Sequence, residues 1–599
     1  MAVYNNIKVT DAGVELLRDV STLKRALTAA GAVTSESIIS DVAAATTIPN
    51  VKQNQDYSLY PSGKNQLVLE VQLTNAGVDA QYTLNTVGFY ANDGVNGNVL
   101  FAVVTAQTPD TIPPETAYPI NINFKEYILL DTSGEVIINA SFAGYASQED
   151  FFNHVNDNNE EFEQLHAQVD DVQSFIGYTD NDIFGLEVDF ANKKFTRLAG
   201  ASDKEAGVDF DDVKCFGGRK RCIVTDAGII LAYYGEPGYT ETGKLTVALT
   251  VNEAVYAVGT TVQVMVYQPR FFYRVVPLVT EKIVDGKGYH MRKARYYVSA
   301  TPKTGFKLHP AFIKNGEEKN YVLIGAYEAC LYDVSAANYI TDDSQIGDFA
   351  SGTGDKLSSI ANVKPVSGIT HNLIRRNCGV AAENRGAGWS QLYGAIASAT
   401  QMLMLIELGT FNTQNAVGRG VCDFASGTGN ESILTGGTAS FGNLTGMAAG
   451  TDGFVSVTYR GQENPWGNIW EFVDGFNIEA WGKNELWIAD NNFADSAGLP
   501  APNGYVNAGI TLAKVNGYVS AMAYNEPFDW LFFASETVGD SNLPVGDNFW
   551  QNNPATNFLI ARLGASWGVG ANAGGFAWSV DTAVSNRSRT VGGRVVYVP

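Results

Sequence analysis

The sequence predicts a mainly β protein with some α-helix, divided into several domains. Three observations support this fold class. Many segments alternate apolar and polar residues with a period of two, as half-buried strands do. The chain contains 61 glycines, which supply the positive-φ positions that turns between short strands need. Its 599 residues exceed what a single hydrophobic core normally organises, so we expect several domains.

The composition is that of a folded protein with an acidic surface. Hydrophobic residues make up 45% of the chain and charged residues 17%, without the charge excess of a disordered protein. A net charge of −23 repels phosphate backbones and anionic lipid. The sequence shows no membrane-spanning apolar run and no secretion signal. We therefore expect a soluble protein, made in a cytoplasm, with no nucleic-acid binding and no membrane insertion.

The first domain is expected over residues 1–145 and is rich in strands. Residues 14–30 have the apolar spacing of a helix, whereas residues 66–73 and 134–142 alternate as strands do. The segment 108–119 contains four prolines and is predicted to be a loop.

A heptad repeat follows the first domain. The first apolar position of the repeat is occupied by Val155, Phe162, Val169 and Ile176. The second is occupied by Phe151, Leu165 and Val172, and by one polar residue, Asn158. This pattern predicts a coiled coil over residues 146–177. An acidic helix of this length gains little from solvent alone, so we expect its seam to pack against copies of itself. A single amphipathic helix docked on a neighbouring domain is the alternative.

The remaining chain divides into two further regions. Residues 178–300 are strand-like and are predicted to form a β-rich spacer domain. Residues 301–599 are rich in glycine and tryptophan, with one clear helical pattern within residues 388–411. The odd number of cysteines argues against a disulfide framework. Cys215 and Cys222 are interpreted as two reduced strand residues on either side of a hairpin at Gly217-Gly218; a cross-hairpin disulfide is the alternative.

Two sequence motifs that suggest catalysis fail on chemical grounds. Residues 238–244 have the spacing of a phosphate-binding loop, but Leu245 stands where a magnesium-binding hydroxyl is required, and a strand pattern follows. Residues 564–568 match the nucleophile elbow GxSxG, which needs a later histidine. The last histidine is His371, so this order is excluded.

The sequence contains no clear metal or cofactor motif. The five histidines are scattered, without HExxH or paired CxxC spacing. We therefore expect no cofactor. Calcium is the one ion left open, because its oxygen ligands need no short spacing, and residues 487–495 are the best candidate segment. Solvated loop carboxylates are the alternative there.

Two C-terminal stretches carry a family resemblance. NPWGNIWEFVDG at residues 464–475 and ARLGASWGVGANAGG at residues 561–575, followed by Gly593-Arg594, resemble the formylglycine-generating branch of the C-type lectin fold. The resemblance implies a lectin fold over residues 301–599. The enzymes of that branch use cysteines close to the C-terminal signature. The last cysteine here is Cys422, so the resemblance implies a binding platform and not an enzyme.

Together with ENRGAGW at residues 383–389, these two stretches are most similar to the receptor-binding tips of bacteriophage tail fibres, including those diversified by retroelements. The N-terminus, through VTDAG at residues 9–13 and LNTVGFYANDG at residues 84–94, resembles the attachment domain of phage tail-collar fibre proteins. The resemblance implies a homotrimeric, hypervariable tail fibre of the virion, assembled in the host cytoplasm. Its implied partners are a tail or baseplate protein and a bacterial receptor, a glycan or a protein. The alternatives are a tailspike enzyme that cleaves surface polysaccharide and a cell-surface adhesin.

The aromatic stretch around residues 463–477 has a structural explanation. Trp470 and Phe472 share one strand face, and Gly467 allows a tight turn beneath Trp466. Large rings of this kind build the core of a fold with few helices. We therefore expect Trp466, Trp470 and Trp567 to be core residues; a sugar platform is the alternative.

Glu471 lies on the same predicted strand and is expected to be buried. A buried carboxylate requires donors, which we expect from backbone amides or from Arg460 or Arg594.

Recognition is expected on exposed loops at residues 547–557 and 579–589, where amides, hydroxyls, arginines and rings occur without a core pattern. The candidate receptor-binding residues are Trp550, Asn552, Asn553, Asn557, Asn572, Trp578, Asp581, Asn586, Arg587 and Arg589. Trp550 and Trp578 are the strongest candidates if they are exposed, since large exposed rings mark contacts. The alternative is that these are ordinary solvated loops.

Overall fold

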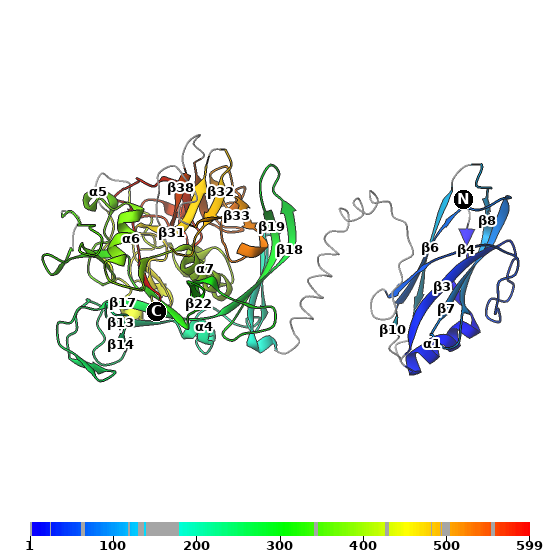
Figure 1. The fold of residues 1–599 in the computed structure, drawn as a ribbon, viewed down its shortest axis with the longest axis horizontal. Coiled ribbons are helices and arrows are strands. Elements are labelled where there is room, and N and C mark those ends of the chain that lie inside the picture. Colours follow the sequence, from blue (N-terminus) through cyan, green and yellow to red (C-terminus); the bar gives the residue numbers. More distant parts are fainter. Residues whose placement is uncertain are drawn as a thin grey trace. The chain divides into compact units, whose positions relative to one another are not determined.

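The computed structural model describes residues 3–23, 25–61, 66–117, 120–129, 137–138, 179–340, 345–425, 431–480, 482–491, 493, 504–552 and 558–599. The chain is mainly β, as predicted, with many sheets and few helices (Figure 1). It forms two compact units, Met1–Asp157 and Asn158–Pro599. The predicted coiled coil at residues 146–177 lies outside the described residues. Within the described ranges, no helix is long and apolar enough to cross a membrane.

The first unit contains one helix and ten strands among its described residues: β1 (Val3–Tyr4), β2 (Lys8–Val9), α1 (Asp11–Leu23), β3 (Ala26–Ser35), β4 (Val51–Gln55), β5 (Ser58–Pro61), β6 (Gln66–Thr74), β7 (Tyr82–Asn92), β8 (Val99–Ile112), β9 (Asn121–Leu129) and β10 (Ile137–Ile138). One sheet has the order β1-β8-β7-β3-β10, and a second has the order β5-β6-β9. The predicted strand at residues 66–73 is confirmed as β6, and its buried Leu67, Leu69, Val71 and Leu73 belong to the core of this unit.

Two predictions in the first unit need correction. The helix ends at Leu23 instead of residue 30, because residues 26–35 pair with β7 as a strand. Helical spacing over a short window is overridden there by tertiary pairing. Strand β8 continues to Ile112, so the proline-rich loop begins later than predicted. Pro109 falls within an irregularity of the β7–β8 register, where the strand tolerates a residue without an N–H.

Three large sheets organise the second unit. The first contains β11 (Phe184–Asp189), β12 (Lys194–Ala199), β18 (Phe272–Lys282), β19 (Tyr289–Ser299), β20 (Lys307–Leu308), β35 (Ala521–Tyr524) and β36 (Ala534–Glu536). The second has the order β14 (Ile230–Tyr233), β13 (Lys220–Val224), β17 (Gln263–Pro269), β23 (Tyr321–Gly325), β41 (Val595–Tyr597) and β27 (Trp389–Gln391). The third has the order β33 (Val506–Thr511), β32 (Glu485–Ile488), β31 (Trp470–Glu479), β38 (Phe558–Leu563), β39 (Trp578–Ala583), β37 (Asn548–Gln551) and β34 (Gly517–Tyr518), with β40 (Val591–Gly592) beside β31.

Shorter elements complete the unit. The small sheets contain β15 (Leu249–Val251), β16 (Ala254–Tyr256), β21 (Ile313–Lys314), β22 (Glu317–Glu318), β24 (Cys330–Asp333), β25 (Asn338–Ile340), β26 (Lys356–Ser358), β28 (Gly446–Met447), β29 (Val457–Tyr459) and β30 (Gln462–Glu463). The α-helices are α4 (Lys214–Gly217), α5 (Gly368–His371), α6 (Arg375–Glu383), α7 (Gly394–Leu408) and α8 (Thr413–Val417). The 3₁₀ turns are η1 (Asp180–Asp182), η2 (Val208–Phe210), η3 (Pro310–Phe312), η4 (Ala439–Phe441), η5 (Glu526–Phe528) and η6 (Gly570–Asn572).

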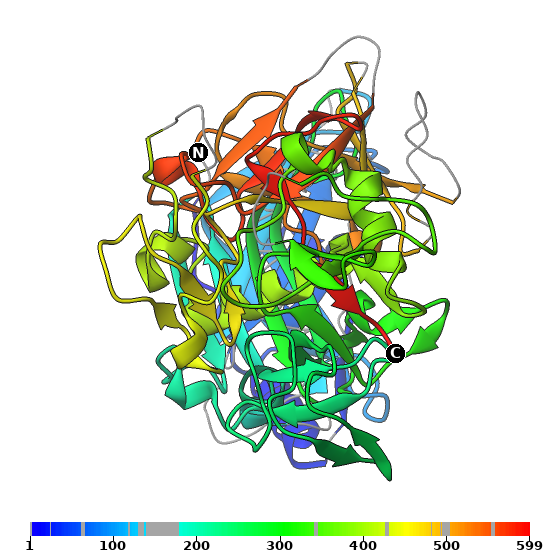
Figure 2. The same cartoon turned by 90° about the vertical axis from the view of Figure 1, so that its left-hand side faces the viewer.

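The predicted boundary between residues 300 and 301 does not separate two compact units. Strand β19 pairs with β35, and β17 pairs with β23, so sheets cross that position. Figure 2 shows the red C-terminal strand β41 beside green strands from the middle of the chain, and β41 pairs with β23 and β27. Residues 179–300 therefore share sheets with the region predicted to be the lectin fold.

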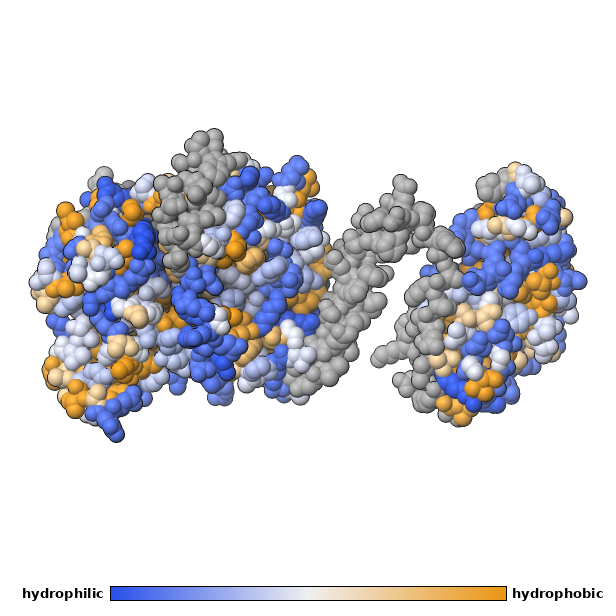
Figure 3. Space-filling model, viewed as in Figure 1, coloured by the Kyte–Doolittle hydropathy of each residue, from blue (hydrophilic) through white to orange (hydrophobic). Residues whose placement is uncertain are grey.

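The predicted helix within residues 388–411 is confirmed as α7 and forms the centre of the second unit. All of its residues from Gly394 to Glu407 are buried. Because alanine, isoleucine, leucine and methionine occur all around this helix, it can be covered on every side by strands. Polar and apolar residues are interspersed on the outer surface that Figure 3 displays.

All five cysteines are free and buried, in agreement with the reduced interpretation. The hairpin interpretation of Cys215 is wrong, since Cys215 lies in the short helix α4 and only Cys222 lies in a strand, β13.

Candidate functional site

The aromatic stretch that resembles the lectin signature, residues 464–475, is buried, and we call it the base. The Trp466 side chain is 0% exposed, and its indole N–H donates to the carbonyl of Gly418 at 3.2 Å. Gly467 has φ +83°, and a Cβ atom there would meet the Val421 backbone at 2.8 Å. Trp470 and Trp567 are also buried. These rings are therefore core residues, as predicted, and Gly467 is required both by its φ and by the close approach of Val421.

A buried ion pair joins Glu471 of this base to Arg594. Arg594 donates from Nε to Oε1 of Glu471 at 2.7 Å, and both residues are buried. The same guanidinium donates to the carbonyls of Gly325 and Glu463. The predicted partner Arg594 is thus confirmed for Glu471, whereas Arg460 pairs with Glu407 at 2.6 Å. Burial raises the pKa of Glu471, and the charge of Arg594 opposes that rise.

A second buried carboxylate, Glu328, orients the turn before β31 and was not anticipated from the sequence. Asn468 Nδ2 donates to it at 2.5 Å, and the amide of Ile469 donates at 3.1 Å. Burial raises the pKa of Glu328 well above its usual value, although Arg594 opposes this. Glu328 comes from a segment far away in sequence, so no local pattern could reveal this contact.

The third sheet has one face turned into the main core. On β39, Trp578 is 2% exposed and stacks on Phe533 with ring centroids 4.5 Å apart. Phe476 of β31 packs edge-on against the same indole at 5.8 Å. Trp578 therefore does not meet the condition of exposure on which its receptor contact was predicted. Strand alternation places it on the face that packs inward.

The opposite face of that sheet carries a row of polar and aromatic side chains. Arg562 on β38 lies opposite Phe472 on one side and opposite Ser579 of β39 on the other. Ser579 in turn lies opposite Trp550 of β37. Residues directly opposite each other point to the same face. The register therefore brings side chains from four strands into one row.

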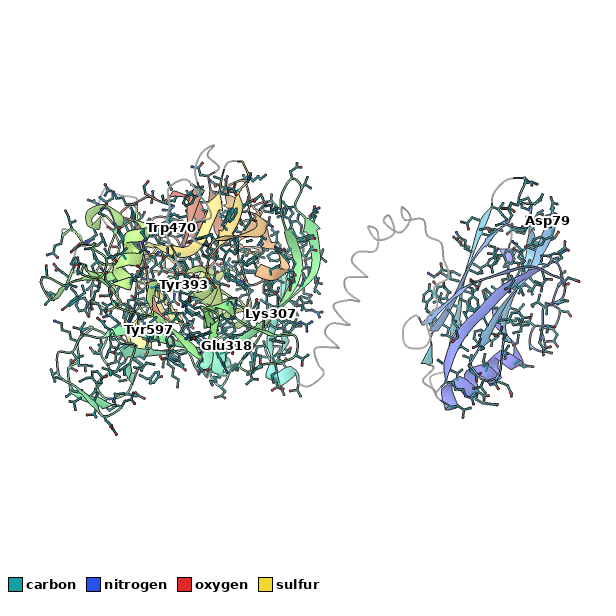
Figure 4. The ribbon with its side chains drawn as sticks, in the orientation of Figure 1. Asp79, Lys307, Glu318, Tyr393, Trp470 and Tyr597 are labelled. Atoms are coloured by element: carbon teal, nitrogen blue, oxygen red, sulfur yellow. The ribbon has the colours of Figure 1, made fainter. Side chains whose placement is uncertain are left out.

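Contacts join this row into a cluster. Trp550 is half-buried and meets Trp470 edge-on at 5.3 Å. The Arg562 guanidinium lies 5.2 Å from the centroid of the Trp470 ring, and Arg562 Nη2 donates to Asp581 at 2.9 Å. The Ser579 hydroxyl also donates to Asp581, at 2.5 Å. We call Trp550, Arg562 and Asp581, which keep partial exposure beside the buried Trp470 and Ser579, the Trp550 surface; Trp470 is labelled in Figure 4.

The Trp550 surface combines opposite charges with aromatic rings. Burial alone would raise the pKa of Asp581, but Arg562 and the hydroxyls of Ser579 and Thr582 outweigh it, so this pKa lies below its ordinary value. Burial lowers the pKa of Arg562. Side-chain exposure is 12% for Arg562 and 33% for Asp581, so both stay within reach of solvent. Such a cluster offers a ligand stacking, hydrogen-bond donors and hydrogen-bond acceptors together.

The loop after β39 is held against a short helix. Arg587 hydrogen-bonds to the side chain of Asn372 at the end of α5, and the Gly368 amide donates to the carbonyl of Ser588 at 2.7 Å. The Asn586 amide donates to the carbonyl of Ala583 at 2.9 Å. The exposed Arg587 and the half-buried Asn586 are thus displayed from a tethered loop.

The structure brings only part of the predicted patch together. Trp550 and Asp581 join the Trp550 surface, while Asn572 lies in η6 and Asn552 is exposed after β37. Arg589 is half-buried in the loop that contains Arg587. Asn553 and Asn557 lie outside the described residues.

Arg562 and Ser579 were not among the sequence-predicted candidates, because their position near Trp550 depends on strand register. The alternation of β38 and β39 was the only sequence signal for it. The predicted loops 547–557 and 579–589 each begin with residues that belong to a strand, β37 and β39.

No group of three or more histidine, cysteine, aspartate or glutamate side chains that could hold a metal ion occurs in the described part of the chain. The candidate calcium segment 487–495 is described only in part, since residues 492, 494 and 495 fall outside it.

Comparisons with known proteins give distant likenesses. No known family model matches the chain, and no curated protein sequence matches it. Among solved structures, the Major Tropism Determinant I1 variant has a TM-score of 0.23 and 11% identity, covering 69% of this chain and 93% of that chain. The U1 variant has a TM-score of 0.23 and 11% identity, covering 71% and 96%. The P3c variant has a TM-score of 0.21 and 11% identity, covering 63% and 72%. At these TM-scores the likeness carries no argument about fold or function.

Proposed function

We propose that this chain is the receptor-binding tail fibre protein of a phage or a phage-tail-like particle, and that it attaches to a bacterial surface receptor through the Trp550 surface. The observation that carries the proposal is the half-buried Trp550 beside Arg562 and Asp581 on one face of a sheet. Partly exposed tryptophan and arginine are the residues that dominate protein contact surfaces.

The rigidity of the base supports this function. Trp470 touches both Trp550 and Arg562 and is itself buried against the fold. Glu471, the next residue on β31, is held by the buried Arg594. A surface whose side chains are already oriented loses little conformational entropy when it binds. Adhesion therefore fits this arrangement.

The order of the regions along the chain supports a fibre. The first unit has the strand pattern that resembles a tail attachment domain, and residues 146–177 carry the heptad repeat. In our proposal these segments dock the protein to a tail or baseplate protein and make it a homotrimer. Three copies would turn weak single-site contacts into strong attachment.

Depletion from solution tests the proposal. The purified full chain is incubated with cell envelopes from a panel of bacteria, and the unbound fraction is measured. We expect depletion by at least one envelope and a loss of at least tenfold in apparent affinity for Trp550→Ala. Trp487→Ala is the matched control, because Trp487 is another half-buried tryptophan of the same sheet.

Other outcomes would contradict the proposal. Release of soluble sugar from the envelopes would support the tailspike alternative instead. Equal binding by wild type and Trp550→Ala would remove the Trp550 surface as the contact. Light scattering gives the mass of the intact chain, and a monomer would exclude the trimeric fibre.

A further inference from the structure

The loop between β39 and β40, residues 584–590, lies at the edge of the Trp550 surface. At one end the loop follows β39, which carries Asp581. At the other end the amide of Trp470 donates to the carbonyl of Thr590 at 2.8 Å, and β40 begins there beside β31. Trp470 is the buried ring that meets Trp550 edge-on. Both ends of the loop are therefore joined to strands that build the proposed receptor contact.

The loop is held by α5 in one conformation. The Gly368 amide donates to the carbonyl of Ser588 at 2.7 Å, and a Cβ atom on Gly368 would lie 2.5 Å from the Ser588 nitrogen. The hydroxyls of Ser588 and Thr590 are hydrogen-bonded to each other at 3.0 Å. Arg587 Nη1 donates to Oδ1 of Asn372, the left-handed residue that ends α5. The Arg587 side chain is therefore oriented before any ligand binds.

Arg587 is a cation with an uncharged partner. Its side chain is exposed, and Asn372 is neutral. Within the described residues, Arg587 forms no ion pair. A guanidinium has five N–H donors, so the bond to Asn372 leaves most of them available to a ligand. The planar arrangement of these donors fits a carboxylate or a phosphate group through two parallel hydrogen bonds.

The carboxylates around the loop are already occupied. Those described on β31, β39 and α6 have cationic partners: Glu471 with Arg594, Asp474 with Arg375, Glu479 with Lys483, Asp581 with Arg562 and Glu383 with Arg376. Glu328 is buried beneath the turn before β31, where it accepts from Asn468 and from the Ile469 amide. None of these groups is paired with Arg587.

The loop is a local exception to the negative charge of the chain. Residues 364–372 and 582–599 contain no aspartate or glutamate, whereas Lys364, Arg587 and Arg589 are cationic. The net charge of −23 belongs to the whole chain. At physiological ionic strength, exposed charges more than about 8 Å apart are largely screened, so a ligand at the loop responds mainly to the nearby cations. An anionic group is therefore attracted here, although the chain as a whole repels anions.

The side chains around Arg587 favour a sugar over a protein as the carrier of that anionic group. The loop consists mainly of small polar residues: Ser585, Asn586, Ser588 and Thr590. Their hydroxyl and amide groups suit a ligand with many hydroxyls, and the nearby half-buried ring of Trp550 offers a flat apolar face. Contacts between proteins, by contrast, are depleted in serine.

We propose that Arg587 binds the carboxylate or phosphate group of an anionic glycan on the bacterial surface. This inference rests on the proposed function and names the chemical class of the receptor. Asn372 is a positioning residue, because it touches only the guanidinium of Arg587 and fixes its direction.

Depletion of the full chain by cell envelopes tests the inference. Arg587→Gln is expected to lose at least tenfold in apparent affinity, because the charge-assisted hydrogen bonds are removed. Arg587→Lys keeps the charge and should lose less. Arg270→Gln is the matched control and should bind as wild type, because Arg270 is a cation of another loop with 37% of its side chain exposed. Added salt should weaken wild type more than Arg587→Gln.

Treatment of the envelopes distinguishes the two sources of the anionic group. Amidation with a carbodiimide and methylamine neutralises carboxylates, and aqueous hydrofluoric acid cleaves phosphodiesters. Loss of wild-type binding after the first treatment identifies an acidic sugar, and loss after the second identifies a phosphate-bearing glycan. Envelopes treated with protease should still deplete the chain.

Asn372→Gly tests the orientation of the arginine. Glycine suits the left-handed backbone of this position and removes the acceptor, so the variant should fold and bind more weakly than wild type but better than Arg587→Gln. Equal binding by wild type and Arg587→Gln would overturn the inference. Unchanged binding after both chemical treatments, or loss of binding after protease, would overturn it as well.

The two proposals fail in different ways. If Trp550→Ala loses binding while Arg587→Gln does not, the inference about the anionic group falls and the proposed function stands. If no envelope depletes the wild-type chain, the proposed function falls and the inference falls with it.

Discussion

Two faces of one sheet in the second unit use the same kinds of side chain for different purposes. On the inner face, Trp578 is stacked between rings and is closed off from solvent. On the outer face, Trp550 is half-buried and stands beside the charged pair Arg562–Asp581. The two tryptophans lie on adjacent parallel strands, with Trp578 opposite Phe549, the residue before Trp550.

The comparison teaches that a shift of one position decides whether a side chain enters the main core or faces the proposed binding surface. Because successive residues of a strand point to opposite faces, Trp578 and Ser579 lie on different faces of the sheet although they are neighbours in sequence. Two ion pairs of this region also differ in their exposure to solvent. Arg594–Glu471 is buried in the base, whereas Arg562–Asp581 reaches solvent.

The largest effect is expected from the buried ion pair. Arg594→Ala leaves Glu471 buried without its partner and should lower the free energy of unfolding by about 3–5 kcal/mol at neutral pH. Arg562→Ala should cost less, about 1–2 kcal/mol, because its partner Asp581 keeps 33% exposure and the hydroxyls of Ser579 and Thr582 as donors. Urea unfolding measures both. Adding Glu471→Gln to Arg594→Ala should restore part of the loss, and comparable losses in the two arginine variants would contradict the distinction between the faces.

A smaller effect is expected from the two tryptophans. Trp578→Phe should lower the free energy of unfolding by on the order of 2 kcal/mol, because it opens space in a packed core. The loss is moderated, since the indole N–H of Trp578 has no hydrogen-bond partner among the described residues. Trp550→Phe should stay within about 0.5 kcal/mol of wild type. Thermal unfolding compares them; a larger loss for Trp550→Phe would show that the faces are wrongly assigned.

The smallest effect concerns Asp547, which precedes β37 and is 0% exposed. Its Oδ2 accepts the Phe576 amide at 2.6 Å, while Oδ1 has no partner within the described ranges. Burial raises the pKa of Asp547 well above its usual value, and the Phe576 amide opposes this. A raised folded-state pKa means that its contribution to stability is present below about pH 4 and is lost as pH rises through the folded-state pKa. Asp547→Asn should therefore become more stable than wild type as pH increases.

Asp540 is the control with the opposite sign. A hydrogen bond from Lys193, with help from the backbone amides of Leu543 and Asn542, lowers the pKa of Asp540 to about 2. Its stabilising contribution is present above about pH 4 and is lost as pH falls through the folded-state pKa. Asp540→Asn should therefore lose stability at neutral pH relative to wild type. Denaturation at a series of pH values measures both trends, and parallel trends would contradict the assignment of Asp547.

Local patterns predicted much of the second unit correctly. The spacing of Trp470 and Phe472, the turn at Gly467, the helix α7 and the need of Glu471 for a buried donor all followed from residue type and periodicity, while the structure chose Arg594 over Arg460 as that donor. The failures have a common cause. Residues 26–30 have helical spacing but pair as a strand, and the sequence gives no sign that β19 pairs with β35. In both cases, pairing between strands that are far apart in the sequence determined the structure.

By itself, the sequence determined a mainly β chain, a ring-packed base and the need of Glu471 for a buried donor, because these follow from strand periodicity, side-chain size and the cost of burying an unpaired carboxylate. Only the tertiary structure decided which tryptophan faces solvent and which side chains stand beside it. Alternation along a strand yields two sets of residues, and the set that becomes the core is chosen by what packs against the sheet. Here the Trp578 side packs into the main core, whereas the Trp550 side packs on a second core cluster that contains Trp470 and Phe472 and leaves only some of its side chains, such as Trp550 and Asp581, partly exposed.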